Sequence, residues 1–349
     1  MEKLKYYAKM AANRQGYVAA QLEVTSSCYQ KCPMCTSWKD HASGSIKGML
    51  TLEQAVDIHN QLKAMPFFEH LSLTGGDPQA WPHLDAFIAI WVHDGKPYEL
   101  QITTALIRPP SEIWSELSTV RISFDGADAD TYEAARGVRR QNPVQAIQWL
   151  EVLGIPYSVL TCLSSHNLEN AQSHGRDLLW AIYGNLHANA RHLRKWIVLV
   201  ELGASVEVSE VLMQYYMRFA KEIELHFKEL KKQPFEISLA GENLQERNEG
   251  IRQAAAKEVR CWAGILGCHI KPNGDVYPCC LVGGEAIATC TGFLLGNVFD
   301  IPLQSIQKAY AENPIYGYRS EVCREVCQFK QLRINQYGEE ASRIRLAIP

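Results

Sequence analysis

The sequence predicts an α/β fold, in which a partial (β/α)6 barrel is followed by a small cysteine-rich domain with a β-hairpin. Short apolar runs alternate six times with segments of helical periodicity over the first two-thirds of the chain, and this pattern implies a parallel sheet with right-handed crossovers. Six such units are fewer than the eight of a closed barrel, so we expect the sheet to stay open on one side. Beyond residue 260 the pattern changes, because seven of the 11 cysteines fall there.

The elements of the barrel follow from the periodicity of the apolar residues. The six predicted strands span Ala19–Val24, His70–Thr74, Glu99–Thr104, Val120–Phe124, Pro156–Cys162 and Trp196–Glu201. The first predicted helix begins at Thr51, which forms a capping box with Gln54. The other predicted helices span Leu84–His93, Ala129–Ala135, Pro143–Leu153, Leu168–Ala181 and Glu207–Lys232.

The cysteine-rich part is predicted to form a domain of its own. A polar stretch over Gly241–Lys257 precedes it, so we predict a barrel domain over residues 1–240 and a second domain over residues 241–349. Within the second domain, the turn residues of Lys271–Asp275 lie between the short runs His269–Ile270 and Val276–Tyr277. This arrangement predicts the β-hairpin.

Composition excludes several classes of protein. The net charge is −3, so the chain lacks the basic footprint of a nucleic-acid-binding protein. The sequence contains no apolar stretch long enough to span a membrane, and its N-terminus does not resemble a secretory signal. An odd number of cysteines without such a signal favours a reducing, cytoplasmic location and metal binding over disulfides.

Three cysteines, Cys28, Cys32 and Cys35, follow the first predicted strand with the spacing Cys-x3-Cys-x2-Cys. A 4Fe–4S cluster normally takes four cysteines, so three thiolates on one tight loop would hold three irons and leave the fourth iron open to an external ligand. A zinc site is the alternative, but zinc usually takes four ligands from paired motifs, and no fourth cysteine lies nearby.

This spacing after the first strand resembles the signature of the radical S-adenosylmethionine (SAM) superfamily. The segment Thr74-Gly75-Gly76-Asp77-Pro78 is similar to the Gly-Gly-Glu-Pro motif of that family, with Asp in place of Glu. In the family this backbone binds the amino group of SAM, and glycines allow the backbone to approach the ligand closely. Met34 matches a hydrophobic position near the adenine of SAM.

Two more stretches resemble family motifs at the ends of the third and fourth predicted strands. Ile102–Thr104 resembles the third-strand motif, although Ala105-Leu106 replaces the usual Asn-Gly. Ser123–Gly126 resembles the fourth-strand motif, and Arg136 matches an arginine that often pairs with the carboxylate of SAM. Since ligands bind at the carboxyl ends of strands in α/β proteins, the resemblance implies a SAM site. Its expected residues are Met34, Thr74, Gly75, Gly76, Asp77, Ser123, Asp125 and Arg136.

The C-terminal cysteines resemble the SPASM/twitch extension of radical SAM enzymes, which carries auxiliary iron–sulfur clusters. A full SPASM domain holds two clusters and needs several closely spaced cysteines near its C-terminus. Beyond residue 300 the sequence has only Cys323 and Cys327, so one auxiliary 4Fe–4S cluster is expected. Its expected ligands are Cys261, Cys279, Cys323 and Cys327. Cys268 or Cys280 is a possible substitute for one of these ligands. A zinc ribbon is the alternative, although its paired Cys-x2-Cys spacing is missing.

Two residues at predicted strand ends are candidates for catalysis. Cys162 ends the fifth strand, where a thiol would be able to return a hydrogen atom to a substrate radical; the alternative is a small buried apolar side chain. Glu201 ends the sixth strand and is a candidate base or substrate-binding group; the alternative is a carboxylate in water.

The resemblance implies a radical reaction. The cluster, reduced by a flavodoxin- or ferredoxin-type donor, cleaves SAM to a 5′-deoxyadenosyl radical, which takes a hydrogen atom from the substrate. We expect oxidation or epimerisation of a small molecule in specialised metabolism, because a cluster loop that starts at residue 28 leaves no room for an N-terminal peptide-binding module. One alternative is a maturase that epimerises or cross-links a ribosomally synthesised peptide. Another is a non-enzymatic electron carrier, which would leave the SAM motifs unexplained.

Overall fold

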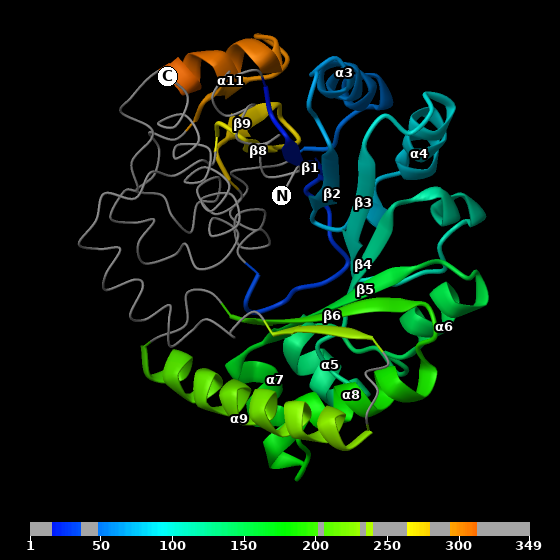
Figure 1. The fold of residues 1–349 in the computed structure, drawn as a ribbon, viewed down its shortest axis with the longest axis vertical. Helices are drawn as coiled ribbons and strands as arrows, with labels where there is room; N and C mark the ends of the chain where they lie inside the picture. Colours follow the sequence, from blue (N-terminus) through cyan, green and yellow to red (C-terminus); the bar gives the residue numbers. More distant parts are fainter. Residues whose placement is uncertain are drawn as a thin grey trace. The chain divides into compact units, whose positions relative to one another are not determined.

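The computed structural model describes residues 16–35, 48–201, 206–230, 235–239, 264–279 and 294–312. All six predicted strands are present (Figure 1): β1 (Ala19–Thr25), β2 (His70–Gly75), β3 (Glu99–Thr104), β4 (Thr119–Ser123), β5 (Tyr157–Leu163) and β6 (Leu193–Val200). The helices among them are α3 (Leu52–Lys63), α4 (Leu84–His93), α5 (Ala129–Arg136), α6 (Gln145–Val152), α7 (Ser165–Ser173), α8 (Leu178–Asn189) and α9 (Val206–Leu230). The predicted α/β class is confirmed.

The chain forms two compact units. One comprises residues 1–27, 39–101 and 246–349, and the other comprises residues 28–38 and 102–245, so that the division falls inside β3. In the first unit, β1 pairs in parallel with β2 and with β8 (Gly267–Ile270). In the second unit, β5 pairs in parallel with β4 and β6, and β6 with β7 (Glu236–Leu239). The domain boundary predicted between residues 240 and 258 lies outside the described residues and stays a prediction.

The strands alternate between apolar and polar side chains, because successive residues of a strand face opposite sides of a sheet. On β1, Leu22 and Val24 are fully buried, and on β2 the fully buried Leu71 and Leu73 pair with Ala20 and Leu22. The intervening positions carry polar groups, as at Glu23. One face of the sheet therefore builds the apolar core, and the other face presents hydrogen-bonding groups.

The helices follow the predicted starts closely, with one correction. The predicted capping box at Thr51 is present, since its hydroxyl accepts from the Gln54 amide while the Gln54 side chain accepts from the Thr51 amide. The single helix predicted over residues 168–181 is wrong. The chain instead forms α7 and α8, because Gly175 adopts a φ of 67° and Asp177 caps a new helix. Helices α7, α8 and α9 lie on the same side of β6 (Figure 1).

The predicted hairpin is present and joins the first unit. Strands β8 and β9 (Asp275–Tyr277) are antiparallel, and β10 (Gly296–Asn297) continues the sheet beyond β9. Helix α11 (Leu303–Glu312) packs on Ile265 and Leu266 through Tyr310. The sequence analysis did not predict β7, β10 or α11. Among the described helices, none is both long and apolar enough to cross a membrane.

Candidate active site

The three clustered cysteines lie on a loop directly after β1. Cys28 is exposed, Cys35 is half-buried and Cys32 is buried. The Cys35 amide donates to the Cys32 carbonyl at 3.0 Å, which closes a tight turn with half-buried Met34 inside it. Among the described residues, no three Cys, His, Asp or Glu side chains converge on a point that fits a single metal ion. The thiolates of a 4Fe–4S cluster bind different irons, so the cluster does not require such convergence.

Helix α5 binds this cysteine loop through hydrogen bonds. The Lys31 amide donates to the Arg136 carbonyl at 3.0 Å, and the Gln30 side-chain amide donates to the Tyr132 hydroxyl at 2.5 Å. Gly137 ends the helix with a φ of 67°, and a Cβ at this position would lie 2.4 Å from the Lys31 carbonyl oxygen. The approach of the loop therefore needs both the left-handed backbone and the missing side chain of glycine.

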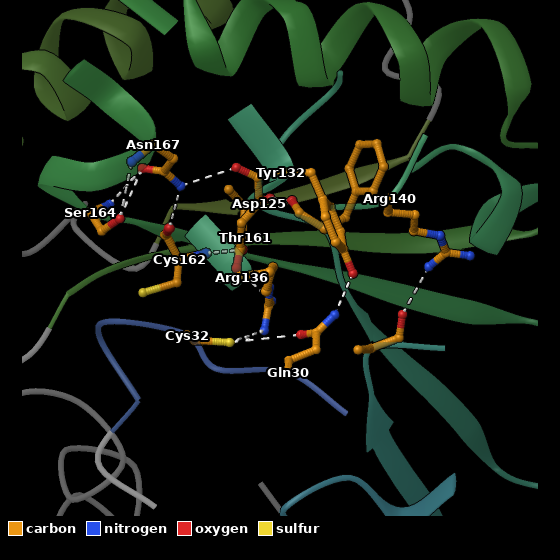
Figure 2. Close-up of polar contacts among 12 residues, drawn as sticks. Gln30, Cys32, Asp125, Tyr132, Arg136, Arg140, Thr161, Cys162, Ser164 and Asn167 are labelled. Atoms are coloured by element: carbon orange, nitrogen blue, oxygen red, sulfur yellow. Dashed lines mark hydrogen bonds and ion pairs between the residues drawn. The ribbon is translucent and has the colours of Figure 1, made fainter. Parts of the chain in front are cut away.

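The Arg136 side chain lies between the cysteine loop and the end of β4 (Figure 2). Its Nη2 is 2.5 Å from the fully buried Oδ2 of Asp125, and its Nη1 donates to Cys32 Sγ at 3.6 Å. Burial lowers the pKa of the guanidinium, but the charge of Asp125 outweighs burial and raises this pKa above its usual range. Burial also raises the pKa of the Cys32 thiol, and the charge of Arg136 opposes that rise.

Cys162 lies in the same network, at the end of β5. Its backbone amide donates to Asp125 Oδ1 at 2.7 Å, and its carbonyl accepts from the Asn167 side chain at 2.9 Å. Asn167 also donates to the Asp125 carbonyl and forms a capping box with Ser164. Burial raises the pKa of the Cys162 thiol well above its ordinary value, and the charge of Asp125 adds to the rise. This cysteine is therefore a protonated thiol at neutral pH.

Two other predicted residues lie at neighbouring strand ends of this unit. Ser123 is the half-buried last residue of β4. Glu201 follows β6, and its backbone amide donates to the Leu163 carbonyl at 2.8 Å. Within the described part of the chain, the buried Oε2 of Glu201 has no hydrogen-bond partner. The Glu201 charge adds to the rise in the pKa of Cys162 that burial and the charge of Asp125 cause.

The predicted glycine motif has a structural role that the sequence analysis did not predict. The Gly76 amide donates to the Thr25 carbonyl, and the Asp77 amide donates to the Ser27 carbonyl, both at 2.8 Å. A Cβ on Gly75 would lie 2.3 Å from the Thr25 oxygen, and a Cβ on Gly76 would lie 2.1 Å from the Ser27 oxygen. These glycines allow the backbone just before Cys28 to lie against the end of β2. Thr74 is half-buried there, while the Asp77 side chain is buried and caps a short 3-10 helix by accepting from the Gln79 amide.

The third-strand motif keeps a glycine-like conformation without glycine. Leu106 stands where the resembling motif has Gly, and its φ is 49°, in the left-handed region. Its amide donates to Thr104 Oγ1 at 2.9 Å, and its side chain is fully buried. Leu106 therefore holds a left-handed backbone without glycine, at a cost of roughly 1–2 kcal/mol.

A buried charged cluster was missed by the sequence analysis. In the first unit, Glu23 Oε1 accepts from His269 Nε2 at 2.9 Å and from Lys271 Nζ at 2.8 Å. All three side chains are almost completely buried. Burial raises the pKa of Glu23, but the hydrogen bonds and charges of His269 and Lys271 outweigh it and lower this pKa to about 2. The parallel pairing of β1 with β8 creates this cluster, and that pairing was not predicted.

The predicted auxiliary ligands are described in part. Cys279 is half-buried and lies two residues after β9. Cys268 lies on β8 on the same side as fully buried Ile270. Burial raises the pKa of its thiol well above the ordinary value. Cys261, Cys280, Cys323 and Cys327 lie outside the described residues, so the ligand set stays a prediction.

Comparison with known families decides between the metal-binding alternatives. Residues 22–178 match the radical SAM superfamily, and residues 261–330 match the SPASM iron–sulfur cluster-binding domain. The chain belongs to the radical SAM superfamily. Its cofactors are therefore SAM, the 4Fe–4S cluster that binds SAM, and an auxiliary iron–sulfur cluster. The zinc alternatives for both cysteine clusters are set aside.

Individual relatives agree with this assignment. The radical SAM chain is 26% identical over 287 residues to the mycofactocin maturase MftC of Mycobacterium ulcerans (strain Agy99), covering 79% of this chain and 70% of the relative. It shares the fold of SuiB from Streptococcus suis with a TM-score of 0.65 at 14% identity, covering 90% of this chain and 71% of SuiB. It also shares the fold of anSMEcpe, solved with bound AdoMet and the Cp18Cys peptide, with a TM-score of 0.57 at 14% identity. This match covers 93% of this chain and 95% of anSMEcpe.

The residues of the cysteine loop fit the cluster chemically. The loop supplies three thiol groups within eight residues. Cys28 and Cys35 are not part of the buried core, whereas Cys32 is buried. Arg136 places a cation and an N–H donor beside Cys32 Sγ, and both features favour an anionic iron–sulfur centre. The donor set is thus the one expected for the cluster.

Proposed function

We propose that this radical SAM enzyme modifies a peptide substrate. The cysteine loop held by α5, with Arg136 at Cys32, is the observation that carries the radical chemistry. The peptide is supported by the relatives: MftC is named a maturase, SuiB was solved bound to the precursor peptide SuiA, and anSMEcpe was solved with the Cp18Cys peptide. These names favour a peptide over the small molecule expected from the sequence alone.

In this proposal, each part of the site has a distinct task. Cys28, Cys32 and Cys35 hold the cluster, which with SAM supplies a 5′-deoxyadenosyl radical that takes a hydrogen atom from the substrate. A flavodoxin- or ferredoxin-type protein supplies the electron. The residues that bind SAM in this proposal come from the cysteine loop, the strand ends and the end of α5: Met34, Thr74, Gly75, Gly76, Asp77, Ser123, Asp125 and Arg136. Cys261, Cys279, Cys323 and Cys327 hold the auxiliary cluster in a domain that follows residue 240.

The state of Cys162 favours epimerisation as the outcome. A substrate carbon radical is quenched by a hydrogen atom, and a thiol donates one only while it carries its proton. The raised pKa of Cys162 keeps the proton at Sγ. Transfer forms the new C–H bond and breaks the S–H bond, and leaves a sulfur radical on Cys162. One electron from the electron-donor protein and one proton then restore the thiol. Glu201 Oε2, which has no hydrogen-bond partner among the described residues, is the route for that proton in this proposal.

The test uses anaerobically reconstituted enzyme with SAM and a reductant. We expect 5′-deoxyadenosine to form and to increase when a peptide encoded beside the gene is added, with modification of that peptide detected by mass spectrometry. Small molecules of matched polarity serve as the control. Stimulation by a small molecule and not by the peptide would overturn the substrate class. Absence of 5′-deoxyadenosine under every condition would favour an electron carrier and overturn the enzyme assignment.

A further inference from the structure

Cys32 is more closely surrounded by polar groups than its position on a loop requires. Its residue is 7% exposed, although Cys28 on the same loop is exposed. Two side chains approach its sulfur: Arg136 Nη1 at 3.6 Å and Gln30 Oε1 at 3.7 Å. Figure 2 shows both side chains directed at the sulfur from different elements, the loop itself and α5. A buried sulfur with two polar neighbours is a site where hydrogen bonds influence the metal bound to it.

The guanidinium is fixed independently of the loop. Its other nitrogen, Nη2, pairs with Asp125 at 2.5 Å, and Asp125 is in turn held by the Cys162 amide at 2.7 Å. Asp125 is fully buried and the Arg136 side chain is 13% exposed. Because Asp125 holds Nη2, the planar guanidinium is fixed with Nη1 directed at Cys32 Sγ, and Nε is left without a hydrogen-bond partner among the described residues.

The orientation of the Gln30 side-chain amide suits a protonated Cys32 thiol. Binding of iron to this sulfur would favour the opposite orientation of the amide. In the present arrangement Cys32 donates its S–H to Gln30 Oε1, while Gln30 Nε2 donates to the Tyr132 hydroxyl. A thiolate bound to iron has no hydrogen and only accepts, so the carbonyl oxygen would face a negative sulfur. Rotation of the amide by half a turn exchanges its oxygen and nitrogen. Nε2 then donates to the sulfur, and the Tyr132 hydroxyl, which can also donate, satisfies Oε1.

We propose that Arg136 and Gln30 are paired N–H donors to the Cys32 thiolate and set the reduction potential of the SAM-binding cluster. The inference rests on the assignment of Cys28, Cys32 and Cys35 to that cluster. Reduction adds one negative charge to the cluster, and donors directed at a ligand sulfur stabilise the more negative state. Both contacts therefore raise the potential and favour acceptance of the electron from the donor protein. This role of Arg136 is additional to pairing with the carboxylate of SAM.

The test is a potentiometric titration of reconstituted protein followed by electron paramagnetic resonance. The cluster in question is the one whose signal changes when SAM is added, which separates it from the auxiliary cluster. Arg136→Lys keeps a positive charge for Asp125 but loses the two-nitrogen fork, and Gln30→Leu removes the amide. We expect each to shift the reduced-to-oxidised ratio at fixed potential about tenfold toward the oxidised state, or ~59 mV for a one-electron couple.

Arg139→Lys is the matched control, because Arg139 lies close in sequence and pairs with Asp130 and Glu133 at the surface. This variant should leave the potential unchanged. A SAM-sensitive signal with the wild-type potential in both Arg136→Lys and Gln30→Leu would overturn the proposal while leaving the cluster assignment intact. Loss of every SAM-sensitive signal from wild-type protein would instead overturn the cluster assignment itself.

A second experiment tests the Arg136 contact in protein that keeps Arg136, so that its result does not depend on a variant that loses its cluster. In protein labelled with nitrogen-15 arginine, pulsed electron paramagnetic resonance detects a nitrogen that donates a hydrogen bond to the reduced cluster. We expect a coupled arginine nitrogen in the SAM-sensitive signal of wild-type and Arg139→Lys protein. Its absence from the wild-type signal would overturn the role of Arg136.

Discussion

The backbone amide of Cys162 donates to the buried carboxylate of Asp125 at 2.7 Å, across 37 residues of sequence. The same carboxylate pairs with Arg136, which contacts Cys32. One buried side chain therefore connects the end of β5, the end of α5 and the cysteine loop. Because Asp125 is fully buried, its charge is compensated only by the groups around it, and this makes the network sensitive to a change of a single residue.

Asp125→Asn is expected to destabilise the protein by about 3–5 kcal/mol, because it leaves the Arg136 charge buried without its counter-ion. The change is nearly isosteric, so packing is preserved and the loss reports the ion pair. Urea unfolding of the cluster-free protein measures it. Asp130→Asn is the control, since that residue pairs with Arg139 at 45% exposure and should cost less than about 1 kcal/mol. Equal midpoints for the two variants would contradict this account.

Cys162→Ala is expected to separate the two halves of the reaction. Hydrogen abstraction from the substrate does not need the thiol, so formation of 5′-deoxyadenosine should continue. The product should no longer gain deuterium from D2O, because the exchangeable S–H is absent. Mass spectrometry of the product measures this. Cys268→Ala, which removes another buried thiol of raised pKa, should leave deuterium uptake intact. Undiminished uptake in Cys162→Ala would remove Cys162 as the hydrogen donor.

Gly76→Ala is expected to displace the backbone before Cys28, because the added Cβ would lie 2.1 Å from the Ser27 oxygen. We expect a loss of about 1–3 kcal/mol from overpacking, together with lower iron content after reconstitution. Gly184→Ala is the matched control, since a Cβ there meets no described atom within 4 Å. In the interior of α8 it should stabilise the protein by about 1 kcal/mol. Similar iron content and stability in the two variants would show that close approach at Gly76 is unimportant.

The buried Glu23 cluster predicts a specific loss of stability in acid. The pKa of Glu23 is about 2 in the folded protein against an ordinary value of 4.5, so the unfolded chain binds the proton first. The stabilisation is therefore present above pH 4.5 and is lost as the pH falls from 4.5 toward 2. Circular dichroism at a series of pH values measures the transition.

A double-variant cycle tests the same cluster. Glu23→Gln alone should flatten the acid transition and cost about 3–5 kcal/mol at neutral pH, because it leaves Lys271 buried without its counter-ion. Adding Lys271→Met should recover much of that loss. An unchanged acid transition in Glu23→Gln would show that other carboxylates control it.

The sequence predicted most of this fold because its strands and helices have regular apolar spacing. Strands β1 to β6 and helix α4 lie close to their predicted bounds. The break between α7 and α8 was missed because Gly175 and Asp177 interrupt an apolar pattern that continues on both sides. Strand β7 has only four residues, which is too few for a periodic pattern to identify it. Helix α11 does carry a local signal that the sequence analysis missed, because its buried Leu303, Ile306 and Tyr310 recur at helical spacing.

In the site too, local motifs were predicted and contacts between distant parts of the sequence were missed. Motif spacing identified the cysteine loop, and Asp125 and Arg136 at the ends of elements. It could not identify Gln30 or Tyr132, whose contact spans 102 residues, nor Glu23, whose partner His269 lies 246 residues away. Gln30 lies within the Cys-x3-Cys spacing, which was the only local signal. Long-range pairs form through the topology of the sheet, and one sequence without its fold does not reveal them.

The most direct test of the central assignment is the metal content of Cys28→Ala/Cys32→Ala/Cys35→Ala protein, reconstituted anaerobically beside the wild type and examined by Mössbauer spectroscopy with and without SAM. The account predicts that the triple variant retains only the auxiliary cluster, shows no iron site that responds to SAM, and forms no 5′-deoxyadenosine. A triple variant that kept a SAM-responsive iron site would contradict it.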